Sequence, residues 1–208
     1  KSMLAEDVKP NRLERAQLAL EELLPILKGD RIGLVAFAGT AFVQCPLTVD
    51  YSAFSLALEE LSVETIPRGG TALAEAIREG LKTFSEATPE SQALVLITDG
   101  ESHEGNPLAV VRKAAAKGIK IFCIGIGTPG GELIPVADEE GSRNFLKDRE
   151  GRPVKSRLDE ALLQKVALES GGSYFRATPT ACGLGLIYRE RMAELMTQEL
   201  ESGMRNRY

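Results

Sequence analysis

The sequence predicts an α/β domain with a doubly wound, mostly parallel sheet, helices on both faces and one antiparallel edge strand. Short, almost continuous apolar runs occupy residues 32–37, 93–97 and 119–124, as in strands that are buried on both faces. Segments with apolar residues at helical spacing alternate with these runs. Such alternation is typical of βαβ units, which place helices on both faces of a sheet.

Two more strands complete the predicted sheet. Residues 41–45 follow the first apolar run across Ala38-Gly39-Thr40, which is the spacing of a hairpin, so we expect an antiparallel edge strand there. Residues 173–176 predict a last short strand.

Capping residues mark the predicted helices. Asn11 begins the first helix, with Glu14 in the capping-box position. The remaining helices are expected over 51–61, from Thr71 onward, from Asn106-Pro107 to Gly118, from Asp159 to Ser170-Gly171, and over 184–208. Residues 128–158 break the alternation and predict a hairpin-like insertion within one domain that covers residues 1–208.

Composition excludes several classes of protein. The chain has 208 residues, a net charge of −5 and 43% hydrophobic residues, values that fit one soluble domain and argue against a nucleic-acid-binding surface. Its three cysteines have no CxxC spacing, which argues against a zinc site and leaves their redox state open. No stretch reaches the roughly 18 apolar residues that a membrane span requires.

Hydroxyl and carboxylate side chains are expected at one edge of the sheet. Asp99 follows the run 93–97, Thr71 stands near the start of a helix, and Ser2 precedes the first helix. Ligands bind open α/β sheets beyond the carboxyl ends of the strands. Oxygen donors of this kind suit Mg²⁺, Mn²⁺ or Ca²⁺, so we expect Ser2, Thr71 and Asp99 to bind a divalent cation. We expect Gly70, Gly100, Glu101 and Gly127 at the rim, facing a partner.

The same residues carry a resemblance to a known family. Lys1-Ser2-Met3 resembles the end of the Asp-x-Ser-x-Ser signature of von Willebrand factor type A domains. Gly69-Gly70-Thr71 and Thr98-Asp99-Gly100 look like the other two segments of that family's metal-ion-dependent adhesion site. Residues 2–13, 36–39 and 47–51 look like the membrane-anchored Bat-type aerotolerance proteins of bacteria.

The resemblance implies a binding module and not an enzyme. Its cation would hold an Asp or Glu side chain of a partner protein, and the parent protein would be anchored in the bacterial inner membrane with this domain on the periplasmic side. The signature's aspartate and first serine, and the central strand leading into them, would precede Lys1. We therefore expect weak or absent metal binding by the residues present.

Two alternatives remain open at this stage. A metal-dependent hydrolase would need a base near the cation, for which the sequence offers His103 or Glu101. A nucleotide-binding domain would use Gly125-Ile-Gly127-Thr-Pro-Gly130, which matches G-x-G-x-x-G after a strand but precedes the insertion instead of a helix.

Overall fold

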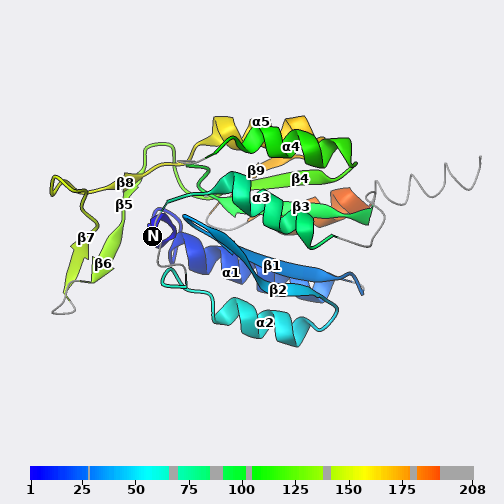
Figure 1. Cartoon of the computed structure of the whole chain (residues 1–208). Helices are drawn as coiled ribbons and strands as arrows, with labels where there is room; N and C mark the ends of the chain where they lie inside the picture. The colour runs from blue at the N-terminus through cyan, green and yellow to red at the C-terminus, as the bar shows by residue number, and fades with distance from the viewer. Residues whose placement is uncertain are drawn as a thin grey trace, which may run out of the picture.

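A computed structural model describes residues 1–27, 29–65, 70–84, 91–101, 105–137, 142–178 and 182–192. Helices and strands follow in the order that the sequence predicts (Figure 1). The helices are η1 (Ser2–Leu4), α1 (Arg12–Leu23), η2 (Leu24–Ile26), α2 (Tyr51–Glu59), α3 (Leu73–Lys82), α4 (Pro107–Ala116) and α5 (Glu160–Ser170). The strands are β1 (Ile32–Phe37), β2 (Ala41–Thr48), β3 (Ala93–Thr98), β4 (Lys120–Gly125), β5 (Glu132–Leu133), β6 (Pro135–Ala137), β7 (Arg143–Phe145), β8 (Lys155–Ser156) and β9 (Tyr174–Arg176).

The main strands form two sheets among the described residues. The strands β3, β4 and β9 are parallel neighbours, while β1 and β2 form a separate antiparallel pair. The antiparallel strand is confirmed, and so is a parallel sheet, which is small and is not joined to β1 and β2 among the described residues. Hydrophobic periodicity identifies strands but does not say which strands pair. Helix α3 contacts β1, β2 and β3, so it packs on both sheets.

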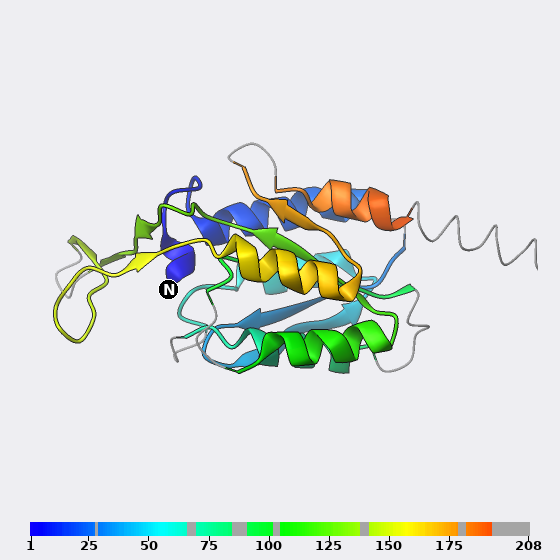
Figure 2. The same ribbon diagram turned by 90° about the horizontal axis from the view of Figure 1, so that it is seen from above.

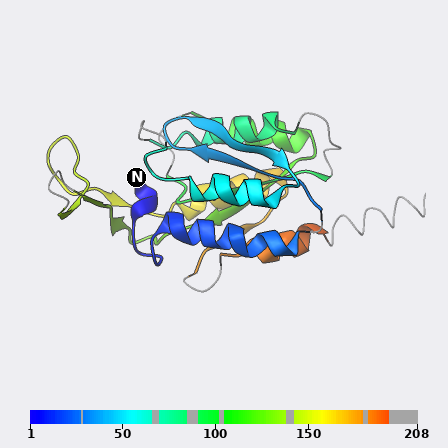
Figure 3. The same cartoon turned by 90° about the horizontal axis from the view of Figure 1, so that it is seen from below.

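Helices cover both faces of the parallel sheet, as predicted (Figures 2 and 3). The side chains of β4 alternate between the two faces. Ile121 and Cys123 pack with α3, α4 and α5, whereas Phe122 and Ile124 pack with α1 and the helix over 184–192. A third cluster joins α2 to the β1–β2 pair. The parallel sheet therefore lies in the middle of a three-layer core.

Predicted caps form at three helices. The side chains of Asn11, Asn106 and Asp159 accept hydrogen bonds from the backbone N–H groups of Glu14, Ala109 and Leu162. Each bond satisfies a donor that the helix itself leaves unpaired.

The expected start of α3 at Thr71 is wrong. The helix begins at Leu73, and its N-cap is Ala72, which has no side chain able to cap. The N–H of Ala72 instead donates to the carbonyl of Ala38, 2.6 Å away. Thr71 therefore lies in the connection before the helix, and its hydroxyl is not used as a cap.

Residues 128–158 contain two antiparallel strand pairs, β5 with β8 and β6 with β7. They project from the body beside the start of the chain (Figure 1). At the other end of the chain the structure describes helix only over 184–192, so the rest of the predicted helix to Tyr208 lies outside the described residues. No helix among the described residues is long and apolar enough to cross a membrane.

Candidate functional site

Asp99 stands where the sequence predicts it, directly after β3. Its side chain is only 2% exposed. Its carbonyl accepts a hydrogen bond from the N–H of Asp159, which ties the turn to the start of α5. Gly100 has φ +77°, and a Cβ there would meet the Asp159 carbonyl oxygen at 2.7 Å. Only glycine fits this close turn without strain, so Gly100 helps to fix Asp99.

The start of the chain lies near Asp99. Burial lowers the pKa of the Lys1 α-amino group, and the negative charge of Asp99 acts on it in the opposite direction. Ser2, the next residue, belongs to η1 and is half-buried. Its hydroxyl makes no hydrogen bond to another described residue.

Thr71 and Gly70 approach the same end of the fold. Gly70 has φ +118°, and a Cβ there would lie 3.4 Å from Gly39 in the β1–β2 turn. The first turn of α3 meets the loop after β3, since a Cβ on Gly105 would lie 3.2 Å from the Cβ of Ala74. Three separate segments therefore converge near the carboxyl end of β3. The hydroxyl of Thr71, like that of Ser2, is not hydrogen-bonded to the described part of the chain.

Arg12 is the residue at the centre of the site that the sequence did not reveal. It is fully buried at the first position of α1. Its Nε and Nη2 donate to the two carboxylate oxygens of Asp7, each at 2.8 Å, and its Nη1 donates to Oδ2 of Asp99 at 3.2 Å. A planar guanidinium suits this arrangement because its donors form a rigid fork.

Asp7 connects Arg12 to the first residue of the insertion. The N–H and the hydroxyl of Thr128 donate to Oδ2 of Asp7 at 2.8 and 2.9 Å. Burial acts to raise the pKa of Asp7, but the hydrogen bonds and charge of Arg12, together with the bonds from Thr128, outweigh it and lower that pKa. Asp7 is therefore held as a carboxylate at neutral pH.

Ser156 brings the last strand of the insertion to the same carboxylates. Its hydroxyl accepts from Nη1 of Arg12 at 2.7 Å. It lies 3.0 Å from Oδ2 of Asp99 and 3.2 Å from Oε2 of Glu101, to either of which it can donate. Glu101 also accepts from the N–H of Arg157 at 2.9 Å. Glu101, predicted at the rim, is thus a contact of the insertion.

Gly127 allows Arg12 to occupy this place. Gly127 has φ +122°, and a Cβ there would meet the Arg12 guanidinium at 2.7 Å. The segment from Gly125 to Gly130 leads into β5 and opens no helix. The structure therefore lacks the helix N-terminus that a dinucleotide fingerprint requires, and the nucleotide-binding alternative is wrong on that point.

Comparisons with known proteins show the family to which the chain belongs. A model of the von Willebrand factor type A domain matches residues 1–101. The fold is similar to BatB from Bacteroides thetaiotaomicron, with 36% identity, a TM-score of 0.87 and 94% of each chain covered. The chain belongs to the von Willebrand factor type A family.

Other relatives extend this result. An aerotolerance-related membrane protein from Bacteroides fragilis is 38% identical, with a TM-score of 0.85 over 92% of this chain and 94% of that one. A UPF0353 protein from Nocardia farcinica is 30% identical over 85% of this chain. This von Willebrand factor type A chain spans about half the length of the curated relatives it matches, 55% in that case.

A more distant structure shows the fold alone. Proximal thread matrix protein 1 from the mussel byssus, described with a zinc-occupied MIDAS motif, is 16% identical with a TM-score of 0.59. The match covers 84% of this chain and 41% of that one.

In this von Willebrand factor type A domain, one carboxylate oxygen of Asp99 is available as a ligand. Arg12 and Ser156 both engage Oδ2 of Asp99, whereas Oδ1 makes a long contact of 3.5 Å with the hydroxyl of Thr98. Carboxylate oxygens are among the ligands that hard cations such as Mg²⁺ prefer.

The described part of the chain has no preformed metal-binding cluster, whether of carboxylate, imidazole or thiolate side chains. It contains no group of three or more His, Cys, Asp or Glu side chains placed to hold a metal ion. Cys45, Cys123 and Cys182 are all free and buried. His103 and Gly69 lie outside the described residues, so the structure does not place them.

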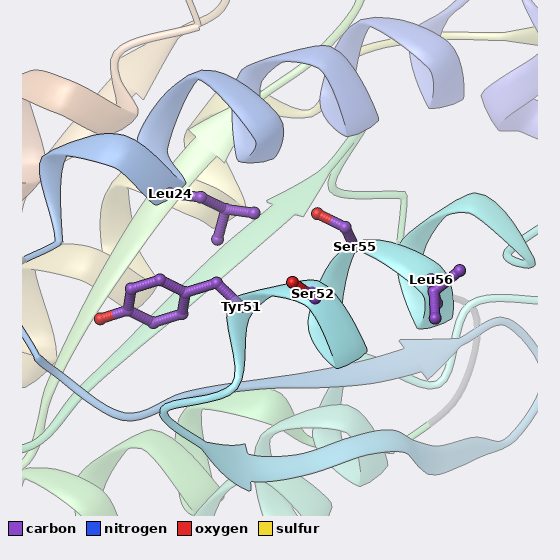
Figure 4. Close-up of a pocket in the computed structure, with 5 residues that line it drawn as sticks. All are labelled: Leu24, Tyr51, Ser52, Ser55 and Leu56. Atoms are coloured by element: carbon purple, nitrogen blue, oxygen red, sulfur yellow. The ribbon is translucent and has the colours of Figure 1, made fainter.

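A surface pocket lies elsewhere on the domain (Figure 4). It is lined by five residues of η2 and α2, namely Leu24, Tyr51, Ser52, Ser55 and Leu56. None of these residues belongs to the cluster around Asp99. The pocket is therefore no part of the candidate site.

Proposed function

We propose that the domain is a binding module in which Ser2, Thr71 and Asp99 hold a divalent cation, Mg²⁺ first among Mg²⁺, Mn²⁺ and Ca²⁺. The bound cation would attract an Asp or Glu side chain of a partner protein. The observation that carries the proposal is the orientation of Asp99. Because Arg12 and Ser156 bind Oδ2, the carboxylate is fixed in one orientation, and Oδ1 is left to bind a cation. A carboxylate that is already oriented loses little conformational entropy when the cation binds.

The surroundings support a partner protein as the ligand. Gly70 leaves space where its segment meets Gly39, and the insertion begins at Thr128, which bonds to the Asp7 carboxylate that also holds Arg12. We infer that the insertion, together with the rim formed by Gly70, Gly100, Glu101 and Gly127, selects the partner.

Calorimetry with Mg²⁺ on the full-length protein tests the proposal. We expect the double variant Thr71→Ala with Asp99→Ala to lose measurable binding. Asp30→Ala is the control, because it also removes a carboxylate but at the far end of β1 from the site. Asp30 precedes β1, whereas Ala38, which follows β1, is the residue that contacts the start of α3. Unchanged Mg²⁺ affinity in the double variant would overturn the proposal.

The proposal assigns no reaction to the domain. Glu101, one candidate base of a hydrolase, is engaged by Ser156 and by the backbone of Arg157. Hydrolysis of a phosphoester or ester that is lost in His103→Ala would contradict this part of the proposal.

We further propose that one more strand of the full-length protein pairs with β1 and β3 and joins the two sheets. Both strands have an edge without a partner among the described residues, and α3 packs on both sheets. Unpaired strand edges favour the addition of a strand. Slow hydrogen exchange of the β1 and β3 amides in the full-length protein is the expected result, and rapid exchange at both edges would contradict it.

We also infer that the full protein is anchored in the bacterial inner membrane with this domain on the periplasmic side. The support is the name of a similar protein, the aerotolerance-related membrane protein of Bacteroides fragilis, and the resemblance noted in the sequence. Protease treatment of spheroplasts tests it, because a periplasmic domain is cut and a cytoplasmic one is protected.

A further inference from the structure

Both ends of the insertion form hydrogen bonds to one buried group of charged side chains. Thr128, its first residue, donates two hydrogen bonds to Asp7. Ser156, near its end, contacts Arg12 and Asp99. Asp7 and Arg12 are themselves joined by two bonds of 2.8 Å. The N–H of Leu158 also donates to the carbonyl of Thr128, which closes the base of the insertion.

Ser156 links the insertion to Asp99 through more than one atom. Nη2 of Arg12 donates to the Ser156 carbonyl at 3.2 Å, and Nη1 donates to the Ser156 hydroxyl. Ser156 is 1% exposed, so water does not compete for these bonds. Hydrogen bonds to charged groups in such a place contribute more than those between neutral groups.

The hydroxyl of Ser156 has a single proton to donate and lies close to two carboxylates. It lies 3.0 Å from Oδ2 of Asp99 and 3.2 Å from Oε2 of Glu101. A hydroxyl has one donor, so a full hydrogen bond can form with only one of the two at a time. A change in the negative charge at Asp99 therefore alters the bond that Ser156 makes to Glu101, and with it the contact of Glu101 with Arg157.

We propose that Arg12 and Ser156 are positioning residues that couple the charge at Asp99 to the conformation of the insertion. A cation bound at Asp99 draws negative charge away from Oδ2 and weakens the bonds that hold the base of the insertion. Coupling of this kind is reciprocal, so a partner that fixes the insertion also changes the affinity for the cation. The cation part of this proposal rests on the proposed function, but the coupling between Asp99 and the insertion does not.

The insertion is placed to act on a partner. It projects from the body next to the start of the chain in two views (Figures 1 and 2). Its outer strand β7 is exposed along its whole length, from Arg143 to Phe145. A small change at the base of a projecting hairpin moves its tip further than its root.

Hydrogen exchange of residues 128–158 in the full-length protein tests the coupling. In metal-free protein, Asp99→Asn should speed exchange of the Arg157 and Leu158 amides roughly tenfold, the effect of losing about one charged hydrogen bond. Ser156→Ala should do the same and should abolish any effect of Mg²⁺ on the insertion. Ser52→Ala, the same change on α2, should leave all these amides as in the wild type.

The outcomes separate this inference from the proposed function. If Mg²⁺ binds in calorimetry but leaves exchange of the wild-type insertion unchanged, the coupling is overturned and the proposed function stands. If Mg²⁺ does not bind, the proposed function fails, and Asp99→Asn in metal-free protein decides the coupling alone. Unchanged exchange in Asp99→Asn overturns the coupling in either case. If Ser156→Ala fails to fold, Glu101→Gln replaces it, and it should speed exchange of Arg157.

Discussion

Arg12 and Asp99 meet at 3.2 Å although 87 residues separate them in the sequence. Their side chains are 0% and 2% exposed, so the contact is a buried ion pair. Asp7 lies on the other side of the same guanidinium and is 5% exposed. Burying charges is costly, and a group of this kind is maintained only if every member remains paired. The stability of the domain is therefore tied to Asp99, one of the residues proposed to hold the cation.

Replacing Arg12 by methionine should lower the free energy of unfolding by about 3–5 kcal/mol, because two buried carboxylates lose their common partner. Urea unfolding of the metal-free protein at pH 7 measures this. The matched control is Arg112→Met, which breaks the more exposed pair with Glu169. Such pairs contribute less than about 1 kcal/mol. Equal losses in the two variants would contradict the central role of Arg12.

The sequence predicts the helices well because their signals are local. Asn11, Asn106 and Asp159 cap helices that start within a residue or two of them, and their side chains reach only three residues along the chain. The same holds for the strand β4, whose apolar run is interrupted only by Lys120. Thr71 shows the limit, since the hydrogen bond of Ala72 to Ala38 sets the start of α3 from outside the helix.

The charged group around Arg12 is not predictable from local pattern. An arginine at the first turn of a helix is normally solvated, and nothing near Arg12 indicates contacts with residues 87 and 144 positions away. Asp99 was predicted because it follows a strand. Asp7, Thr128 and Ser156 were missed as members of the site because their roles depend on how the insertion folds back. Asp7 and Arg12 do both lie in the segment 2–13 that resembles the Bat-type proteins, which was the one available signal.

Asp7 should make stability depend on pH in the acid range. Its pKa is lower in the folded protein than in the unfolded chain, so ionised Asp7 stabilises the fold above the unfolded pKa, about 3.9. This contribution is lost as the pH falls through the folded pKa. The difference in unfolding free energy between the wild type and Asp7→Asn should therefore be constant from pH 7 to about 5 and narrow below about 4.

Urea titrations from pH 7 to pH 2.5 follow this difference. Asp148→Asn is the control, because the pKa of Asp148 is lowered by hydrogen bonds from the Arg152 backbone in an exposed loop. The difference in unfolding free energy between the wild type and Asp148→Asn should be smaller than that between the wild type and Asp7→Asn at every pH. A wild-type advantage over Asp7→Asn that persists unchanged to pH 2.5 would contradict the assignment.

The three cysteines should react slowly with thiol reagents in the folded protein. Burial raises the pKa of Cys123 to about 12 and that of Cys182 to about 11, and it also raises the pKa of Cys45. Little thiolate is present at pH 8, and the thiolate is the reactive form. Labelling at pH 8 followed by mass spectrometry should show modification only after unfolding in urea. Rapid labelling of Cys123 in the native protein would contradict the packing of β4.

Gly127→Ala should disturb the site without touching any predicted ligand. The new Cβ would meet the Arg12 guanidinium at 2.7 Å, and the φ of +122° is unfavourable for alanine. We expect a loss of about 1–3 kcal/mol in the free energy of unfolding, measured in urea. Gly130→Ala is the control three residues away, because a Cβ there meets nothing within 4 Å. Since Arg12 also orients Asp99, Gly127→Ala should weaken Mg²⁺ binding as well, whereas Gly130→Ala should change neither quantity. Equal stability of the two variants would show that Arg12 does not need the space that Gly127 leaves.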